Sequence, residues 1–192
     1  YIYADGNGDK IYGNSYDSEF QGTSITPKYN FGLQASAKWK NVDFSMFWGG
    51  STGFSIYYYS TGRNASQTIY GYAIPQIIAD DHYFYDPANP DDPRTNLTSK
   101  NARLAYNASA PSAANSSLHL EKGDFLKLRN LTIGYTLPDF MSRKAMMKEL
   151  RIFATGENLF SITGFSGQDP EMRTTVGYST MRQYAIGVNV TF

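Results

Sequence analysis

Apolar and polar residues alternate without a break along the last stretch of the chain, QYAIGVNVTF. The apolar or aromatic positions are Tyr184, Ile186, Val188, Val190 and Phe192. Successive side chains of a β-strand point to opposite faces, so this pattern predicts a strand over 183–192 that is apolar on one face only. Such a strand needs neighbouring strands and a cover for its apolar side.

The same alternation predicts four further strands, and together they make the chain all-β. They cover residues 29–39, 42–58, 124–137 and 150–162. The phase of the third strand is ambiguous at FLKLR, which indicates a β-bulge. Pro138 ends that strand, and residues 138–149 form a short connector with room for one helical turn.

The connections between these strands are alternately short and long. Residues 40–41 and 138–149 are the shorter ones, whereas 59–123 and 163–182 are the longer ones. In an up-and-down sheet, the long connections then share one end, as in outer-membrane barrels with short periplasmic turns and long extracellular loops. We therefore expect 59–123 to be one long extracellular loop. The alternative is a β-sandwich, in which the same alternation packs an inner core.

The composition fits strands with one apolar face. Aromatic residues make up 16% of the 192 residues, yet no apolar run reaches the roughly 18 residues that a transmembrane helix needs. The sequence holds no cysteine, which excludes disulfides and thiol catalysis within it. Zero net charge without a basic patch argues against a nucleic-acid partner. Five strands are too few to close a membrane barrel, so we expect a fragment of a larger protein.

The residues between the apolar ones form a mostly neutral, hydrogen-bonding face. It would line the lumen of a barrel, or be the solvated face of a sandwich. Its members are Asn30, Gln34, Ser36, Ser45, Ser51, Asn130, Thr132, Asn189 and Thr191. The sequence shows no nucleophile elbow, metal-binding His pair or Gly-rich phosphate loop, so we expect no enzyme.

Four stretches together resemble a known family. They are FGLQASAKWKNVDFSMFWGGSTG, GDFLKLRNLTIGYTLP, LRIFATGENLFSITGFSGQDPE and YAIGVNVTF. In this order they resemble the C-terminal part of the barrel of SusC/RagA-like TonB-dependent transporters of Bacteroidota. The third stretch carries the family's G-x-N-L-F and G-x-D-P-E patterns, whereas 59–122 shows no clear match.

The resemblance implies a large antiparallel transmembrane β-barrel of the plugged, roughly 22-stranded type. Residues 1–192 would be its C-terminal portion, with about five to six strands and long extracellular loops, and the plug domain would lie outside this chain. The implied function is TonB-dependent import of oligosaccharides or peptides across the outer membrane of a Gram-negative bacterium. The implied partners are a SusD-like surface lipoprotein, TonB, outer-membrane lipid and a dimer of transporter–lipoprotein pairs.

Two other functions remain open on the residues alone. One is a secreted β-sandwich that binds carbohydrate through aromatic loop residues, and it would stay in solution without detergent. The other is a structural surface protein without cargo.

The segment DDHYFYD suggests a contact with a ligand or with the lipoprotein lid. Aromatic rings stack on the apolar C–H faces of sugars, and carboxylates accept hydrogen bonds from hydroxyl groups. The candidate residues are His82, Tyr83, Phe84, Tyr85 and Asp86. The same residues would also suit a solvated loop that packs on its own aromatic rings.

Asp5, Asn7 and Asp9 have the first three spacings of a calcium-binding loop. Lys10 stands where such a loop has glycine, and Tyr16 stands where it has glutamate. The segment therefore predicts either a Ca²⁺ site or a plain Asx turn, and no other cofactor is expected.

The resemblance also suggests a role for the last strand as the signal of the barrel-assembly machinery. An exposed strand edge can pair with the edge of another sheet, which is β-augmentation. The side chains of this signal would face lipid, and they are Tyr184, Ile186, Val188, Val190 and Phe192.

Overall fold

The computed structural model describes residues 5–11, 15–58, 76–99, 101, 103–104, 117–144, 146–173, 177–178 and 180–192. The strands are β1 (Tyr29–Trp39), β2 (Val42–Thr52), β3 (Ser55–Tyr57), β4 (Leu120–Lys122), β5 (Phe125–Thr136), β6 (Glu149–Thr163) and β7 (Gln183–Thr191). The short helices are α1 (Gln76–Asp80) and α2 (Asp139–Lys144), with 3₁₀ turns η1 (Ser15–Asp17) and η4 (Ser117–His119). None of the helices in this part of the chain has the length and apolarity to cross a bilayer.

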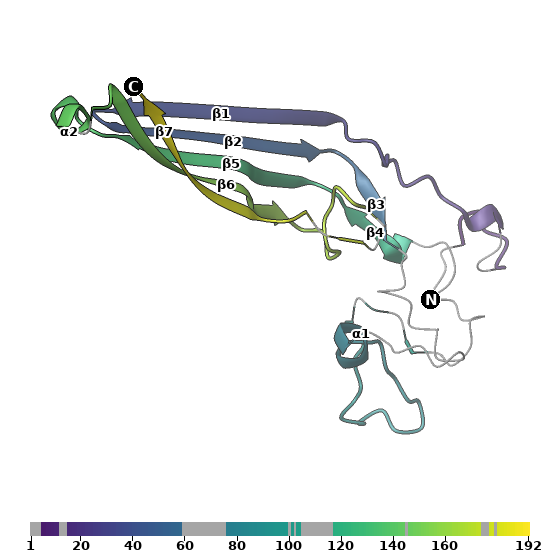
Figure 1. Cartoon of the computed structure of the whole chain (residues 1–192). Helices are drawn as coiled ribbons and strands as arrows, with labels where there is room; N and C mark the ends of the chain where they lie inside the picture. The colour runs from purple at the N-terminus through teal and green to yellow at the C-terminus, as the bar shows by residue number, and fades with distance from the viewer. Residues whose placement is uncertain are drawn as a thin grey trace. The chain divides into compact units, whose positions relative to one another are not determined.

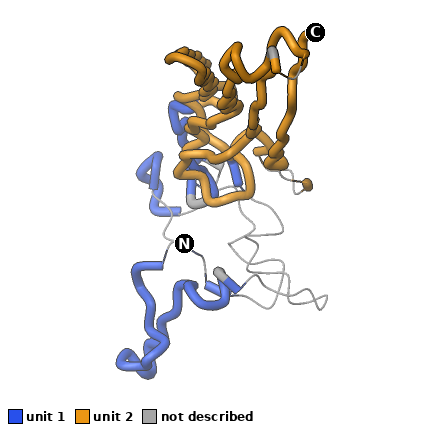
Figure 2. Tube along the Cα trace, turned by 60° about the vertical axis from the view of Figure 1, so that its left-hand side comes forward, with its two compact units in different colours: residues 1–23, 57–121 blue, residues 24–56, 122–192 orange. Residues whose placement is uncertain are grey.

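The chain divides into two compact units, which Figure 2 shows in different colours. Residues 24–56 and 122–192 form the sheet unit, and residues 1–23 and 57–121 form the second unit. The predicted loop 59–123 lies almost entirely within the second unit. Its extracellular position stays a prediction.

The sheet unit is built on five strands in the order β1-β2-β5-β6-β7, in which all neighbours are antiparallel (Figure 1). This confirms the all-β prediction and the order of the predicted strands. The connector 138–149 contains α2, at the same end of the sheet as the last residue (Figure 1). Lys148 N–H donates to Thr191 O over 2.8 Å, which ties the end of the connector to β7.

The predicted strand 42–58 is wrong in its second half. β2 ends at Thr52 because Gly53 adopts a φ of 79°, which a residue with a side chain rarely adopts. The Gly53 N–H donates to Asp124 Oδ1 over 2.8 Å instead of continuing the ladder. The chain then forms β3, which pairs with β4 in a separate sheet, so the described part has seven strands where five to six were expected.

The predicted β-bulge in FLKLR is confirmed, and it lies at Arg129. Phe47 of β2 pairs with Asn130 and Trp48 pairs with Leu128, so Arg129 is skipped in both ladders of β5. One extra residue reverses the phase of a strand. The side chains of Leu126 and Leu128 therefore share a face with the odd-numbered residues that follow the bulge.

The register places the apolar residues of all five strands in continuous rows. Residues directly opposite each other in a ladder share a face and lie about 5 Å apart. Three such rows are Ala35–Met46–Leu131–Gly156–Tyr184, Ala37–Phe44–Ile133–Ala154–Ile186 and Trp39–Val42–Tyr135–Ile152–Val188. We call this side the apolar face.

Candidate functional site

The opposite side of the sheet, which we call the polar face, carries the hydrogen-bonding side chains. All nine residues predicted for this side share it, since their rows alternate with the apolar rows. Thr132 and Thr155 place their hydroxyl oxygens 3.0 Å apart across β5 and β6. Ser51 donates to Asn30 Oδ1 over 2.6 Å. That this face lines a lumen stays a prediction.

The polar face also carries charged side chains, and the most buried of them is Lys127 of β5. Lys127 is 4% exposed, and its ammonium group donates to both carboxylate oxygens of Asp169 over 2.7 Å. The same ammonium group donates to Glu171 Oε2 over 2.6 Å. Arg129 donates to the other oxygen of Glu171 over 2.5 Å. Two cations and two anions thus form a neutral network, which we call the loop cluster.

The loop cluster joins β5 to the connection between β6 and β7. Asp169 is 6% exposed and accepts further hydrogen bonds from the Glu171 N–H and the Thr180 hydroxyl, over 2.9 and 2.7 Å. Burial by itself would raise the pKa of Asp169, but the hydrogen bonds from Lys127 and from these two donors hold it below its ordinary value. Every oxygen of the buried carboxylate therefore has a partner, as a buried charge requires.

The bulge of β5 explains how two cations reach one carboxylate. Because of the bulge, Arg129 lies on the polar face together with its neighbour Asn130. The guanidinium of Arg129 lies over Gly49, where a Cβ would come within 2.9 Å of its Nε. The G-x-N-L-F pattern forms a second irregularity opposite it, with Asn158 at a φ of 52°. Asparagine tolerates this left-handed conformation better than most residues.

A second ion network lies near the other end of the polar face. Arg151 of β6 donates to both carboxylate oxygens of Asp43 of β2, over 2.9 and 2.5 Å. The pair bridges β5, and Gly134 lies between its members. A Cβ at Gly134 would come too close to the guanidinium and the carboxylate, so at least one of these side chains would have to shift. Arg151 also lies 5.0 Å from the centre of the Phe153 ring.

The predicted contact residues of DDHYFYD lie together in the second unit. Phe84 and Asn96 form an antiparallel bridge, and the guanidinium of Arg94 lies 4.6 Å from the centre of the Phe84 ring. Hydrogen bonds from Arg94 hold the pKa of Asp92 at about 2. His82 Nδ1 lies 2.9 Å from Ala79 O.

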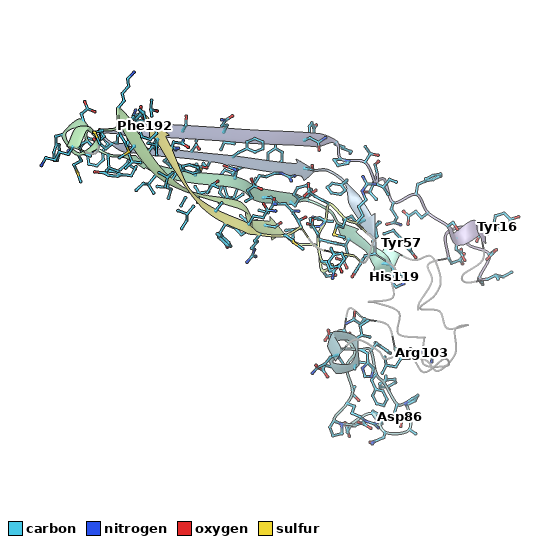
Figure 3. The ribbon with its side chains drawn as sticks, in the orientation of Figure 1. Tyr16, Tyr57, Asp86, Arg103, His119 and Phe192 are labelled. Carbon is cyan, nitrogen blue, oxygen red and sulfur yellow. The ribbon has the colours of Figure 1, made fainter. Side chains whose placement is uncertain are left out.

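The same segment also offers groups for a contact. Tyr83 and Tyr85 are partly exposed, and the Asp86 carboxylate accepts from the Ala88 N–H over 2.9 Å (Asp86 is labelled in Figure 3). The segment thus packs around the ring of Phe84, whereas the side chains of Tyr83 and Tyr85 remain partly exposed. Its role in a ligand or lid contact stays a prediction.

The predicted calcium loop brings Asp5, Asn7 and Asp9 into one turn. Asp5 accepts from the backbone N–H groups of Gly8 and Lys10 over 2.6 and 3.0 Å. Asp9 accepts from the Asn7 side-chain amide over 2.8 Å. Within the described residues, no three His, Cys, Asp or Glu side chains are placed to hold a metal ion together. Calcium binding at Asp5, Asn7 and Asp9 stays a prediction.

His119 is buried in the second unit, and its ring meets the Tyr57 ring edge-on with the centres 5.8 Å apart (Figure 3).

The apolar side chains of the last strand are largely exposed, among them Tyr184 at 74% and Phe192 at 89%. The role of the last strand in assembly stays a prediction.

Comparison with known proteins identifies relatives among TonB-dependent receptors. No model of a protein family matches the chain. The chain is 25% identical to the TonB-dependent receptor P3 of Formosa agariphila, over 87% of this chain and 16% of the relative. It is 26% identical to the TonB-dependent receptor P26 of the same organism, over 99% of this chain and 19% of the relative. The chain therefore spans less than a fifth of these relatives.

Solved structures of the RagAB peptide importer share the fold. The open-open state matches with a TM-score of 0.69 and 20% identity, over 99% of this chain and 20% of that chain. The closed-closed state matches with a TM-score of 0.68 and 19% identity, over 93% of this chain and 19% of that chain. Motifs, sheet register and relatives agree, and this chain matches a fragment of a SusC/RagA-like TonB-dependent transporter.

Proposed function

We propose that the protein carrying this chain imports a polar solute, an oligosaccharide or a peptide, across the outer membrane of a Gram-negative bacterium of Bacteroidota. The single observation that carries this proposal is the division of the sheet into an apolar and a polar face. A transmembrane barrel needs this division, because its wall separates lipid from an aqueous interior. This chain would supply part of the wall and the connecting loops.

The exposure of the apolar face supports a lipid environment. Trp39, Ile133, Ile186 and Val188 are all more than a third exposed, and they lie in adjacent rows. A contiguous apolar surface of several strands is rare on a protein in water. Lipid would cover it without any further protein. Trp39 lies at the end of its strand, where aromatic side chains favour the headgroup region.

The names of the relatives support a TonB-driven mechanism and a partner. The similar Formosa agariphila proteins are named TonB-dependent receptors, and the similar structures are described as a peptide importer called RagAB. We infer that TonB supplies the energy and that a SusD-like lipoprotein covers the extracellular side. The tyrosines of 80–86 favour an oligosaccharide or a contact with this lipoprotein, whereas the RagAB description favours a peptide.

Uptake by whole cells tests this function. Cells that carry the full-length gene are compared with a deletion strain and with a strain that lacks TonB, using fluorescent oligosaccharides and fluorescent peptides in parallel. We expect uptake of one class only, and we expect its loss in both mutant strains. Unchanged uptake of both classes would contradict import. A protein that stays in solution without detergent would favour the carbohydrate-binding β-sandwich.

A further inference from the structure

The connection between β6 and β7 turns back over the polar face at its base. Phe165 and Pro170 are buried there, although both belong to a loop. Phe125 and Lys127 of β5 are also buried on the polar face, and Lys127 binds Asp169, the neighbour of Pro170 in the loop. The base of this loop therefore covers one end of the polar face as a layer on the sheet.

Side-chain bonds fasten this loop base at several points. The loop cluster joins Asp169 and Glu171 to β5, as described above. The Thr163 hydroxyl donates to Asp124 O over 2.8 Å and accepts from the Phe165 N–H over 3.1 Å. The Thr180 hydroxyl donates to Asp169, and this hydrogen bond links the two ends of the loop. The chain is thus held on both sides of its tip.

The energetics of buried charge oppose the movement of this base. Lifting Asp169 from Lys127 would break two charge-assisted hydrogen bonds and separate the two charges. A gate needs two states of nearly equal free energy, of which the minor one is appreciably populated. The loop cluster therefore favours the closed state of this base.

We propose that residues 164–172 are a fixed part of the polar wall, latched by Lys127, Arg129, Asp169 and Glu171, and that they stay in place while solute passes. This inference rests on the proposed function, because it assigns the polar face to the lumen. It makes the four charged residues positioning residues. The loop base then narrows the mouth of the path permanently, and gating belongs to other segments.

Cysteine accessibility in the full-length protein tests the latch. Phe165→Cys places a thiol in the buried base, and Pro170→Cys is a second variant in case the first fails to fold. Gly164→Cys, at an exposed position with open space around its Cβ, is the matched control. Intact cells are labelled with a membrane-impermeant maleimide, in nutrient medium with and without a protonophore that removes TonB-dependent energy. The labelled peptide is quantified by mass spectrometry.

We expect the thiol of Phe165→Cys to react slowly, and at the same rate in energised and de-energised cells. Adding Lys127→Met should raise its labelling by about 150-fold or more, because an uncompensated buried charge opens the base. Lys127→Arg in place of Lys127→Met should keep most of the protection of the thiol from labelling. Faster labelling in energised cells would overturn the fixed wall, since it would make the base a moving gate. Fast labelling without Lys127→Met would overturn the latch itself.

Labelling separates this inference from the proposed function. If the protein imports neither solute class, the comparison of Phe165→Cys with and without Lys127→Met still reports on the latch in purified protein. Import with a base that opens during energised transport would keep the proposed function and reject the fixed wall.

Discussion

The two ion networks of the polar face differ in burial and in what they join. Lys127 and Asp169 have almost no exposed side chain and connect a strand to a loop. Arg151 and Asp43 keep 23% and 30% of their side chains exposed and connect two strands that both pair with β5. Both networks have good hydrogen-bond geometry, so geometry does not distinguish them.

The difference lies in what else holds the partners together. β2 and β6 are each fixed to β5 by a continuous backbone ladder, so their register does not depend on Asp43 and Arg151. The loop base has no ladder, and its position depends on side chains. Removing one partner of an ion pair that joins strands already fixed by backbone hydrogen bonds costs little. Removing one partner of a buried pair that attaches a loop costs much more, because the other charge stays buried without its partner.

Removing the buried cation should have the largest effect. Lys127→Met leaves Asp169 and Glu171 partly buried with fewer partners, and it should lower the free energy of local opening of the loop by about 3–5 kcal/mol. Hydrogen exchange of the peptide over 165–172, measured on the full-length protein in detergent, reads this opening. Lys144→Met, at an exposed lysine of α2, is the control. Unchanged exchange in Lys127→Met would show that the burial of the loop base, and not the cluster, holds it.

Low pH should also lower the free energy of local opening of the loop base, but by less than Lys127→Met does. Burial raises the pKa of Glu171, but the bonds from Arg129 and Lys127 outweigh it, and Asp169 behaves alike. Both folded-state pKa values therefore lie below the ordinary values of 3.8 and 4.5. The stability that they add is complete above those ordinary values and is lost as the pH falls through the folded ones.

The measurement for this acid effect is exchange of the loop peptide, divided by the intrinsic rate at each pH. A peptide within β6 serves as the reference. We expect the ratio of loop to reference to rise only below about pH 4.5. A rise that begins near neutral pH would contradict the assignment to these two carboxylates.

Much of the sheet could be predicted from the sequence, because its signal is local. Alternation predicts β1, β5, β6 and β7 to within a residue or two, and the broken phase at FLKLR predicts the bulge. The end of β2 could not be predicted this way. The apolar pattern continues through Phe54 and Ile56, and only the positive φ of Gly53 interrupts the strand.

The ion networks could not be predicted, because their members are far apart in the sequence. Lys127 and Asp169 are 42 residues apart, and Asp43 and Arg151 are 108 apart. A signal was nevertheless present. LKLR places two positive charges within one strand, and G-x-D-P-E offers two acids in one short loop. Pairing the two motifs required the fold.

The next smaller loss of stability should come from a substitution at Gly134, which lies close to the side chains of Arg151 and Asp43. Gly134→Val should push the Arg151 guanidinium and the Asp43 carboxylate apart, and overpacking of this kind costs about 1–3 kcal/mol. The temperature at which the folded band of the full-length protein converts on an SDS gel should fall. Gly164→Val, with nothing within 4 Å of its Cβ, should leave it unchanged. In an Arg151→Ala background the Gly134→Val effect should shrink, and an equal effect there would assign the strain to the strand itself.

The smallest effect should come from Asp43→Asn. Water reaches both members of this pair and can solvate Arg151 when its partner becomes neutral, so the change should cost about 0–1 kcal/mol in the same gel assay. Asp43→Asn combined with Arg151→Gln should be as stable as Asp43→Asn alone. A loss as large as that of Lys127→Met would break the comparison, because the ladders of β5 would then not be sufficient to hold β2 and β6. A small loss would mean that the two networks, although both lie on the polar face, differ in what they hold: one reinforces a sheet that is already fixed, and the other fixes a loop.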